Sequence, residues 1–248
     1  MKEFKGDLHI HTCLSPCGDS EMVPSAIVNE AKKNLDIIGI SDHNSTENVD
    51  AVKKVARIEG LEVIGGVEIT SAEEVHILGF FDNEGSLKTI QEIIYENLPG
   101  ENNETIFGEQ IVIDEYDRKI GVNKKLLIGA TTLSVQKIVE TIHSLGGLAI
   151  ASHIDREAFS ILGQLGFIPE GLALDALEIS PLNSLESIRT KFPQIHNFPF
   201  VSFSDAHRLE EVGKSTTNFL IEEASIQEIK KALLNQDGRS ILAHFRYS

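Results

Sequence analysis

The chain has 248 residues, of which 41% are hydrophobic and 24% are charged, as is usual for a globular protein of one or two domains. Its net charge of −16, from 38 acidic and 22 basic residues, argues against an extended duplex nucleic acid as partner but not against a small anionic substrate. No apolar run approaches the roughly 18 residues that cross a membrane, and no signal-peptide segment precedes the first apolar run, so we expect a cytoplasmic protein without a membrane partner.

Short apolar runs alternate along the chain with stretches that have the spacing of amphipathic helices. We expect strands at Phe4–Ile10, Asp36–Ile40, Leu61–Ile69, Val75–Phe81, Leu148–Ala151, Ala176–Ile179 and Phe198–Phe203. We expect helices at Pro24–Lys33, Glu47–Ile58, Ser134–Ser144 and Asn183–Lys191. This alternation predicts an α/β fold with a largely parallel sheet or barrel.

One pair of strands breaks the alternation. Leu61–Thr70 and Val75–Phe81 are separated by too few residues for a crossover helix, so they are predicted to form an antiparallel hairpin. If Thr70 pairs with Glu74, Glu68 stands directly opposite His76, with Cβ atoms roughly 5 Å apart. A carboxylate and an imidazole at that spacing can share one metal ion.

The segment Pro99–Thr132 is a second irregularity. It begins with a polar stretch, and Gln110–Ile113 and Lys125–Ile128 are predicted to be two arms of a hairpin around Tyr116-Asp117-Arg118. We interpret the segment as an insertion or flap on the main domain. A solvated surface excursion and a lid over a substrate are both compatible with the pattern.

Two clusters of possible metal ligands lie near opposite ends of the sequence. His9 and His11 follow Asp7 at two-residue spacing, and Asp205 and His207 repeat that spacing after the last expected strand. Residues i and i+2 of a strand share a face, so each cluster directs its side chains together. Neutral imidazoles and carboxylates bind zinc, manganese and iron, so the two clusters predict a metal site.

Further histidines and carboxylates follow the expected strands. Asp42 and His43 come after the strand that ends at Ile40, and His153 comes after Leu148–Ala151. Active sites of α/β barrels lie at the carboxyl ends of the strands. Clustered titratable groups are costly to bury unless an opposite charge compensates them, so these positions favour one shared metal centre over separate structural roles.

The order of these residues closely resembles the PHP (polymerase and histidinol phosphatase) superfamily over nearly the whole chain. The segments that carry the resemblance are Asp7-x-His9-x-His11, Asp19, Asp42-His43, Gly66-Val67-Glu68, His76, His153 and Ser204-Asp205-Ala206-His207. The resemblance implies a distorted (β/α)7 TIM-like barrel of the PHP type. It implies a stand-alone, single domain over residues 1–248, with residues 99–132 as a small hairpin-like insertion.

The resemblance also implies a trinuclear site for two to three divalent ions of manganese, iron or zinc. Nine residues match the ligand positions of the family: His9, His11, Asp19, His43, Glu68, His76, His153, Asp205 and His207. By the family pattern, one ion has the ligands His9, His11, Glu68 and Asp205. Glu68 bridges to a second ion, which also binds His76 and His153, and the third ion binds Asp19, His43 and His207.

The function that this resemblance implies is a metal-dependent phosphoesterase acting on a small phosphorylated metabolite or nucleotide. A hydroxide bridged by metal ions attacks phosphorus, because the ions lower the pKa of bound water to near neutrality. The catalytic candidates beside the bridging Glu68 are Arg156 and Asp7. Arg156 grips the phosphate with its planar fork, or else forms a surface ion pair. Asp7 is expected to orient a ligand histidine.

Two other functions stay open at this point. Barrels with a His-x-His motif also serve amidohydrolases of C–N bonds, although a bridging Glu68 suits the phosphoesterase better and no lysine fills the usual bridging position. A non-catalytic, metal-binding regulatory module is the other. The chain departs from the small-molecule branch of the family at residues 13–18, which hold Cys13 and Cys17, and at residues 99–132. The substrate, native metals and oligomeric state are therefore left open.

Overall fold

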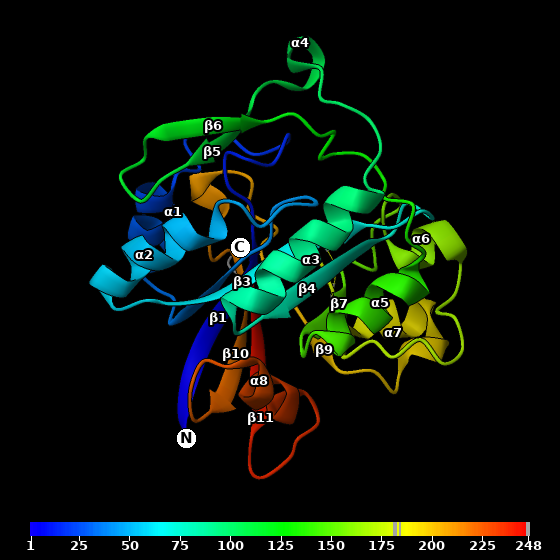
Figure 1. Cartoon of the computed structure of the whole chain (residues 1–248). Helices are drawn as coiled ribbons and strands as arrows, with labels where there is room; N and C mark the ends of the chain where they lie inside the picture. The colour runs from blue at the N-terminus through cyan, green and yellow to red at the C-terminus, as the bar shows by residue number, and fades with distance from the viewer. Residues whose placement is uncertain (181–182, 184, 247–248) are drawn as a thin grey trace.

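The computed structural model describes residues 1–180, 183 and 185–246 (Figure 1). The strands are β1 (Lys2–Ile10), β2 (Ile37–Ile40), β3 (Glu62–Thr70), β4 (His76–Phe81), β5 (Gln110–Ile113), β6 (Lys119–Asn123), β7 (Leu148–Ala151), β8 (Ala176–Glu178), β9 (Phe200–Val201), β10 (Ser215–Ile221) and β11 (Ser240–Arg246). The helices are α1 (Pro24–Ala31), α2 (Val49–Glu59), α3 (Glu84–Asn97), α4 (Glu104–Phe107), α5 (Val135–Ser144), α6 (Ile161–Leu165), α7 (Leu185–Lys191) and α8 (Ile226–Leu233), with 3-10 turns η1 (Pro193–Ile195) and η2 (Leu209–Glu211).

Nine of the described strands form one curled sheet in the order β11-β10-β1-β2-β3-β4-β7-β8-β9. β1, β2 and β3 are parallel to one another, and so are β7, β8 and β9. β4 is antiparallel to both of its neighbours, and β10 is antiparallel to β1 and β11. The predicted α/β fold with a curled sheet is confirmed, but the sheet is mixed rather than largely parallel.

A short contact closes the curled sheet into a distorted barrel. The chain that follows β9 returns beside the end of β1, where Ile10 and Ala206 form a parallel bridge. The His11 N–H donates to the Ala206 carbonyl at 2.9 Å, and the Ala206 N–H donates to the His9 carbonyl at 3.1 Å. The two ligand clusters predicted from opposite ends of the sequence are therefore neighbours in space.

Two apolar cores lie on the two faces of the sheet. Helices α1, α2, α3 and α5 cover the outer face, and the cluster there includes Ile77 of β4 and Val67 of β3. The inner cluster fills the barrel and includes Leu78 of β4 and Ile64 of β3. Side chains alternate between the faces of a strand, so Glu68 shares the inner face of Ile64. The polar centre is thus the top layer of the barrel interior.

The end of β1 departs from simple alternation. Its pairing with β2 shifts between Asp7 and Ile10, and Leu8 packs in the inner core while Ile10 packs in the outer core. Sequence spacing predicted that these two side chains share a face. A local irregularity of this kind re-aims the side chains that follow it.

The β3–β4 hairpin is confirmed as antiparallel, but its predicted register is wrong. Thr70 pairs with His76, and Glu68 pairs with Leu78, because the loop Ser71–Val75 is longer than the predicted register allows. The error is two residues. Because the side-chain period of a strand is also two, Glu68 and His76 still point to the same face.

The segment Pro99–Thr132 contains the separate two-stranded sheet of β5 and β6, which lies across the barrel end opposite the N-terminus (Figure 1). The first predicted arm, Gln110–Ile113, is confirmed. The second arm is Lys119–Asn123 rather than Lys125–Ile128, because the turn is tighter: the Asp117 N–H donates to the Asp114 carbonyl at 3.1 Å. Residues 125–128 instead lead back over the barrel.

Strands β10 and β11 and helices α3, α4, α6 and α8 were not predicted. β10 reads Ser-Thr-Thr-Asn-Phe-Leu-Ile, and its first residues are buried although they are polar. A hydrophobicity pattern does not reveal such a strand, since its burial depends on hydrogen bonds such as Ser202 Oγ to Ser215 Oγ at 2.7 Å. In the described part of the chain, no helix has the length and apolar character needed to cross a membrane.

Candidate metal centre

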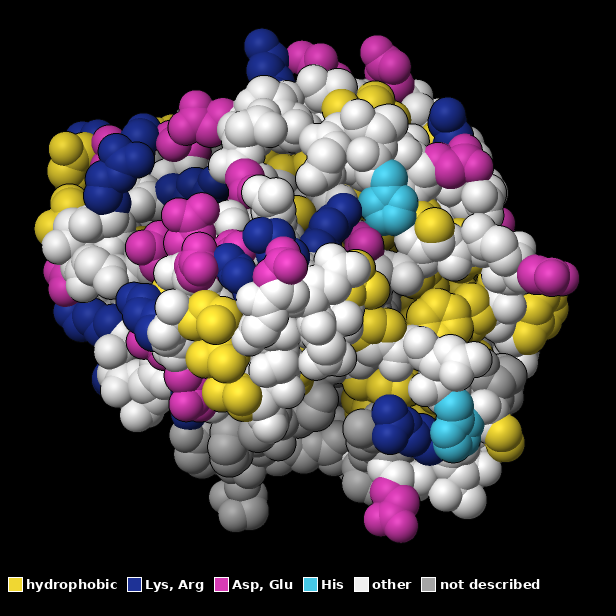
Figure 2. Space-filling model, turned by 90° about the horizontal axis from the view of Figure 1, so that it is seen from below, with side chains coloured by type: hydrophobic (Ala, Val, Ile, Leu, Met, Phe, Trp, Pro, Cys, Tyr) yellow, Lys and Arg dark blue, Asp and Glu magenta, His cyan; other side chains and the backbone are white. Residues whose placement is uncertain are grey.

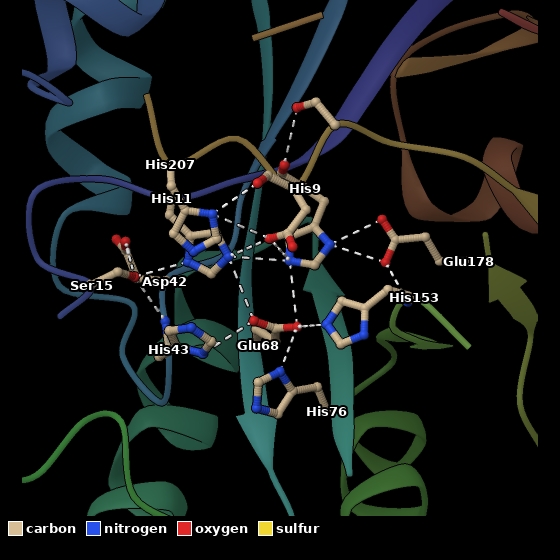
Figure 3. Close-up of polar contacts among 12 residues, drawn as sticks. His9, His11, Ser15, Asp42, His43, Glu68, His76, His153, Glu178 and His207 are labelled. Carbon is tan, nitrogen blue, oxygen red and sulfur yellow. Dashed lines mark hydrogen bonds and ion pairs between the residues drawn. The ribbon is translucent and has the colours of Figure 1, made fainter. Parts of the chain in front are cut away.

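Eight of the nine predicted ligands converge at one end of the barrel (Figure 3). His9 lies on β1, Glu68 on β3 and His76 at the start of β4, and the remaining five follow strand ends: His11, His43, His153, Asp205 and His207. β4 runs antiparallel to its neighbours, so its first residue lies at the same barrel end as the last residues of β1 and β3. The topology therefore assembles side chains that are distant in sequence.

Glu68 is the centre of this group. Its Oε1 lies 3.1 Å from His76 Nδ1, 3.3 Å from His153 Nε2 and 3.4 Å from His9 Nε2. Its Oε2 lies 3.1 Å from His43 Nδ1 and 3.5 Å from His11 Nε2. One buried carboxylate thus faces imidazoles on both of its oxygens, which is the arrangement that a carboxylate bridging two cations requires.

A second carboxylate stands beside the first two histidines. Asp205 Oδ1 lies 3.2 Å from His9 Nε2 and 3.1 Å from His11 Nε2, and these two nitrogens are 3.2 Å apart. Within the described part of the chain, three groups of side chains have ligand atoms within 4.8 Å of one another: His9, His11 and Asp205; His43, Glu68 and His76; and His11, His43 and His207.

Asp19 lies outside these three groups. Its side chain is exposed, and its Oδ1 accepts a hydrogen bond from the Glu21 N–H at 3.0 Å. Its backbone N–H donates to the His207 carbonyl at 2.9 Å, so the residue borders the centre without directing its carboxylate into it. A ligand role for Asp19 stays a prediction.

Hydrogen bonds set the tautomer of His9. Its Nδ1 lies 3.0 Å from both oxygens of the buried Glu178, so it must carry the proton and donate. Its Nε2 faces Asp205 and Glu68, and these carboxylates together with Glu178 hold the pKa of His9 well above its ordinary value. A metal ion bound there would replace the proton on Nε2 and use its lone pair. Glu178 also accepts from the His153 N–H at 3.0 Å. Sequence reasoning missed Glu178, although a carboxylate inside the apolar run Ala176–Ile179 is a signal of such a role.

His11 is oriented in the same way through a hydroxyl. Ser15 Oγ donates to Asp42 Oδ1 at 2.8 Å and accepts the His43 N–H at 3.1 Å. Its remaining contact, 2.9 Å to His11 Nδ1, therefore receives the His11 proton. The Nε2 of His11 therefore has a lone pair available for a metal ion, and this atom faces the Nε2 of His9.

Asp7 does not have the contacts predicted for it. It accepts from the Ser204 hydroxyl at 2.6 Å, the Ser204 N–H at 3.0 Å and the Gly213 N–H at 2.8 Å. These bonds tie β1 to the segment that carries Asp205. Asp7 thus fixes backbone, while Glu178 orients the ring of His9.

The electrostatics of the centre favour a cation. Burial alone raises the pKa of Glu68, but His76, His9 and His43 outweigh it and hold that pKa well below its ordinary value. Burial, together with the nearby His207, lowers the pKa of His11 to about 4. Burial also holds the pKa of His43 well below its ordinary value, whereas Glu178, Asp205 and Glu68 outweigh burial and raise the pKa of His9. Carboxylates and imidazoles together are the donor set of a divalent transition metal, which competes with protons for the same nitrogens.

The ring nitrogens of the clustered histidines give a second, independent indication that the centre binds a cation. Among the described buried side chains, His153 Nδ1 has no hydrogen-bond partner, and His43 Nδ1 has only its 3.1 Å ion pair with Glu68. The 3.2 Å approach of the Nε2 atoms of His9 and His11, and an unpaired nitrogen on His153, are costly in a buried site without a cation. The residues present therefore fit divalent metal ions.

Arg156 lies at the rim of the centre. Its Nη1 forms a 2.6 Å ion pair with Asp205 Oδ2, which leaves Asp205 Oδ1 directed at the histidines. The side chain is 37% exposed, and it lines a cavity of about 400 Å³ above the centre. The ion pair expected as the alternative is thus present, with Asp205 as its partner, and a contact of Arg156 with a phosphate stays a prediction.

The flap contributes to the same cavity. Ile128 lines it together with His43, Glu68, His76, His153, Arg156, Ala158, Phe159, Asp205 and His207. The buried Asn44 holds the flap there, because its Nδ2 donates to the carbonyls of Leu127 and Gly129, both at 2.8 Å. Asn44 directly follows His43, so the flap is fastened to the loop that carries a predicted ligand.

The two cysteines take no part in these groups. Both are free thiols, with Cys13 buried and Cys17 exposed. Burial raises the pKa of Cys13 to about 12, so its thiol stays protonated near neutral pH. A protonated thiol is a poor metal ligand.

Two family models match the chain. The model described as PHP domain matches residues 7–158, and the model described as PHP-associated matches residues 190–237. The first covers more than half of the chain and includes six of the eight converging side chains.

Individual proteins resemble the chain more distantly. The uncharacterized protein YqxK of Bacillus subtilis is 24% identical over 267 residues, which cover 99% of this chain and 65% of YqxK. The 5'-3' exoribonuclease of Haemophilus influenzae is 23% identical over 190 residues, covering 60% of this chain and 68% of that protein.

Solved structures show the same fold. The lesion-specific endonuclease PfuEndoQ of Pyrococcus furiosus has a TM-score of 0.76 at 19% identity, covering 100% of this chain and 60% of that one. An endonuclease Q complex with a 27-mer duplex that carries an abasic lesion at the active site has a TM-score of 0.70, also at 19% identity, covering 98% of this chain and 59% of that one. The chain thus spans less than two thirds of YqxK and of both endonuclease chains.

Proposed function

The chain belongs to the PHP domain family, and from that premise we propose that it is a metal-dependent phosphoesterase acting on a small phosphorylated metabolite or nucleotide. The observation that carries the proposal is Glu68, whose two oxygens face five imidazoles at 3.1–3.5 Å. We also propose that residues 1–248 are one domain, with residues 99–132 as a flap over the centre.

The residues that would hold the metals are proposed from the family pattern together with the three groups of ligand atoms. His9, His11 and Asp205 would form one site. Glu68 would be shared with a second site at His76 and His153, and the group of ligand atoms at Glu68 and His76 also includes His43. His43 and His207 form the third with His11, and Asp19 completes it if its side chain turns inward. Divalent ions, when bound, polarise phosphoryl oxygens and make water nucleophilic near neutral pH.

The residues of the chain supply the rest of the chemistry. Arg156 offers a planar, permanently charged fork at the cavity rim, where it can pair with non-bridging phosphoryl oxygens. Glu178 and Ser15 accept from the Nδ1 atoms of His9 and His11, so the Nε2 atoms are the nitrogens that would bind a metal ion. Ile128 of residues 99–132 contributes an apolar side chain to the wall of the same cavity.

A nuclease is the second candidate, because the similar exoribonuclease and endonuclease Q are, by their names, enzymes that cut nucleic acids. The net charge of −16 argues against a long polyanion as substrate. Figure 2 shows the barrel end away from the centre, where acidic and basic side chains are interspersed. We therefore place the small substrate first.

One assay separates the candidates. Phosphate release from a panel of phosphomonoesters with Mn²⁺ should exceed both the cleavage of a 27-mer duplex with an abasic site and the hydrolysis of an amide panel. A Glu68→Gln variant controls for contaminating phosphatases and should be inactive throughout. Strand cleavage without monoester hydrolysis would replace the proposal with the nuclease, and amide hydrolysis alone would replace it with an amidohydrolase.

A further inference from the structure

One loop delivers three different chemical groups to the cavity. His153, Arg156 and Phe159 lie three residues apart between β7 and α6, and all three line the cavity. The Arg156 N–H donates to the His153 carbonyl at 3.0 Å, and the Ser160 hydroxyl donates to the Arg156 carbonyl at 2.5 Å. The loop therefore holds a predicted metal ligand, a cation and an aromatic ring in a fixed order.

Phe159 is unusual in two respects. Its side chain is 41% exposed although it lies beside a buried polar centre, and its backbone has a φ of +57°. A bulky residue in the left-handed region is strained, and such strain persists where surrounding contacts impose it and is frequent at functional sites. Here the His76 N–H donates to the Phe159 carbonyl at 2.9 Å and fixes the position.

One face of the Phe159 ring is in contact with another side chain. It stacks on the imidazole of His76, with centroids 4.8 Å apart and an angle of 18° between the planes. The exposed part of the ring faces the cavity, whose wall carries two further apolar side chains, Ile128 of the flap and Ala158. The cavity thus has an ionic side at the predicted ligands and an apolar side at Phe159, Ala158 and Ile128.

We propose that Phe159 is a stacking platform for a planar aromatic ring of the substrate, so that the preferred substrates are mononucleotides. This inference rests on the proposed phosphoesterase function and names its substrate class. With the phosphate between the centre and Arg156, the ring of the nucleoside lies against Phe159, one step further along the same loop. A cavity of about 400 Å³, narrowed by Ile128, suits a single nucleotide rather than a strand.

Phe159→Leu tests the platform, because leucine keeps an apolar side chain and bears the same left-handed backbone while it removes the ring. Base stacking on an aromatic side chain contributes enough affinity for about a 10-fold effect. The measurement is kcat/KM for adenosine 5′-monophosphate divided by kcat/KM for ribose 5-phosphate, at saturating Mn²⁺. We expect this ratio to fall about 10-fold in Phe159→Leu and to be kept in Phe159→Tyr.

A matched control and a binding measurement complete the design. Phe167→Leu removes another exposed phenylalanine, 57% exposed and outside the cavity lining, and should leave the ratio unchanged. The Kd of the non-hydrolysable phosphonate analogue of adenosine 5′-monophosphate should rise about 10-fold in Phe159→Leu alone.

The outcomes are distinct. If Phe159 only supports His76, Phe159→Leu lowers turnover of both substrates alike and the ratio stays constant, which overturns the platform while the phosphoesterase stands. Equal binding of the phosphonate to parent and variant also overturns it. An oligonucleotide preferred over the mononucleotide overturns the mononucleotide class. A metal-loaded parent that hydrolyses no phosphoester refutes the proposed function itself.

Discussion

Replacing Glu178 by glutamine should weaken metal binding about 10- to 100-fold, as outer carboxylates of metal-bound histidines typically do. Two N–H groups, His9 Nδ1 and the His153 amide, reach the Glu178 oxygens at 3.0 Å. Glutamine offers one acceptor oxygen, and its NH₂ group then faces the other donor. One charge-assisted bond is lost, worth about 1.5–3 kcal/mol, which matches the expected change in affinity.

The assay is calorimetric titration of chelator-treated protein with Mn²⁺, together with the Tm of the metal-free protein. Glu223→Gln is the matched control, because Glu223 is exposed and distant from the centre in sequence and fold. It should bind Mn²⁺ like the parent. If Glu178→Gln binds Mn²⁺ with the same Kd as the parent, Glu178 does not control the orientation and tautomer of the His9 ring.

Three further outcomes are expected. Arg156→Ala should lower kcat/KM for a phosphomonoester about 10- to 100-fold without changing the Mn content at saturation, and equal kcat/KM values would assign Arg156 to the Asp205 ion pair alone. Glu68→Ala should abolish turnover, so near-parent rates in the Mn-saturated variant refute the bridging carboxylate. Arg239 holds the pKa of Glu228 at about 2, against an ordinary 4.5, so the stability from this pair is complete above pH 4.5 and lost as the pH falls toward 2. The Tm deficit of Glu228→Gln at pH 7 should shrink on acidification, whereas a constant deficit contradicts the charge pair.

Most of the buried strands could be predicted from the sequence, because their apolar runs are distinct from the polar segments around them. Apolar runs such as Leu148–Ala151 match the observed strand because both faces of a barrel strand are buried. The same logic failed for Ser215–Ile221, whose polar residues are buried through hydrogen bonds to β9 and its neighbours. The register of the β3–β4 hairpin failed because loop length, not hydrophobicity, decides it.

The candidate ligands were easier to predict from the sequence than the residues that hydrogen-bond to them. Ligand residues carry a recognisable order, and eight of the nine converge. Supporting residues have no local signature: Glu178 meets His9 across 169 positions of sequence, and Ser15 meets Asp42 across 27. The proposed role of Phe159 could not be predicted from the sequence either. It depends on the positive φ of this residue and on the stacking of its ring against His76, and no local sequence pattern indicates either.

The central claim is that clustered histidines and carboxylates hold the metal ions on which phosphoester hydrolysis depends. The most direct measurement is phosphate release from a phosphomonoester by chelator-treated protein as Mn²⁺ is added, with bound metal determined in parallel by elemental analysis. Activity should be absent without metal and should rise as two to three equivalents bind. Full activity in excess chelator, or saturation with Mn²⁺ that produces no hydrolysis, would contradict the account.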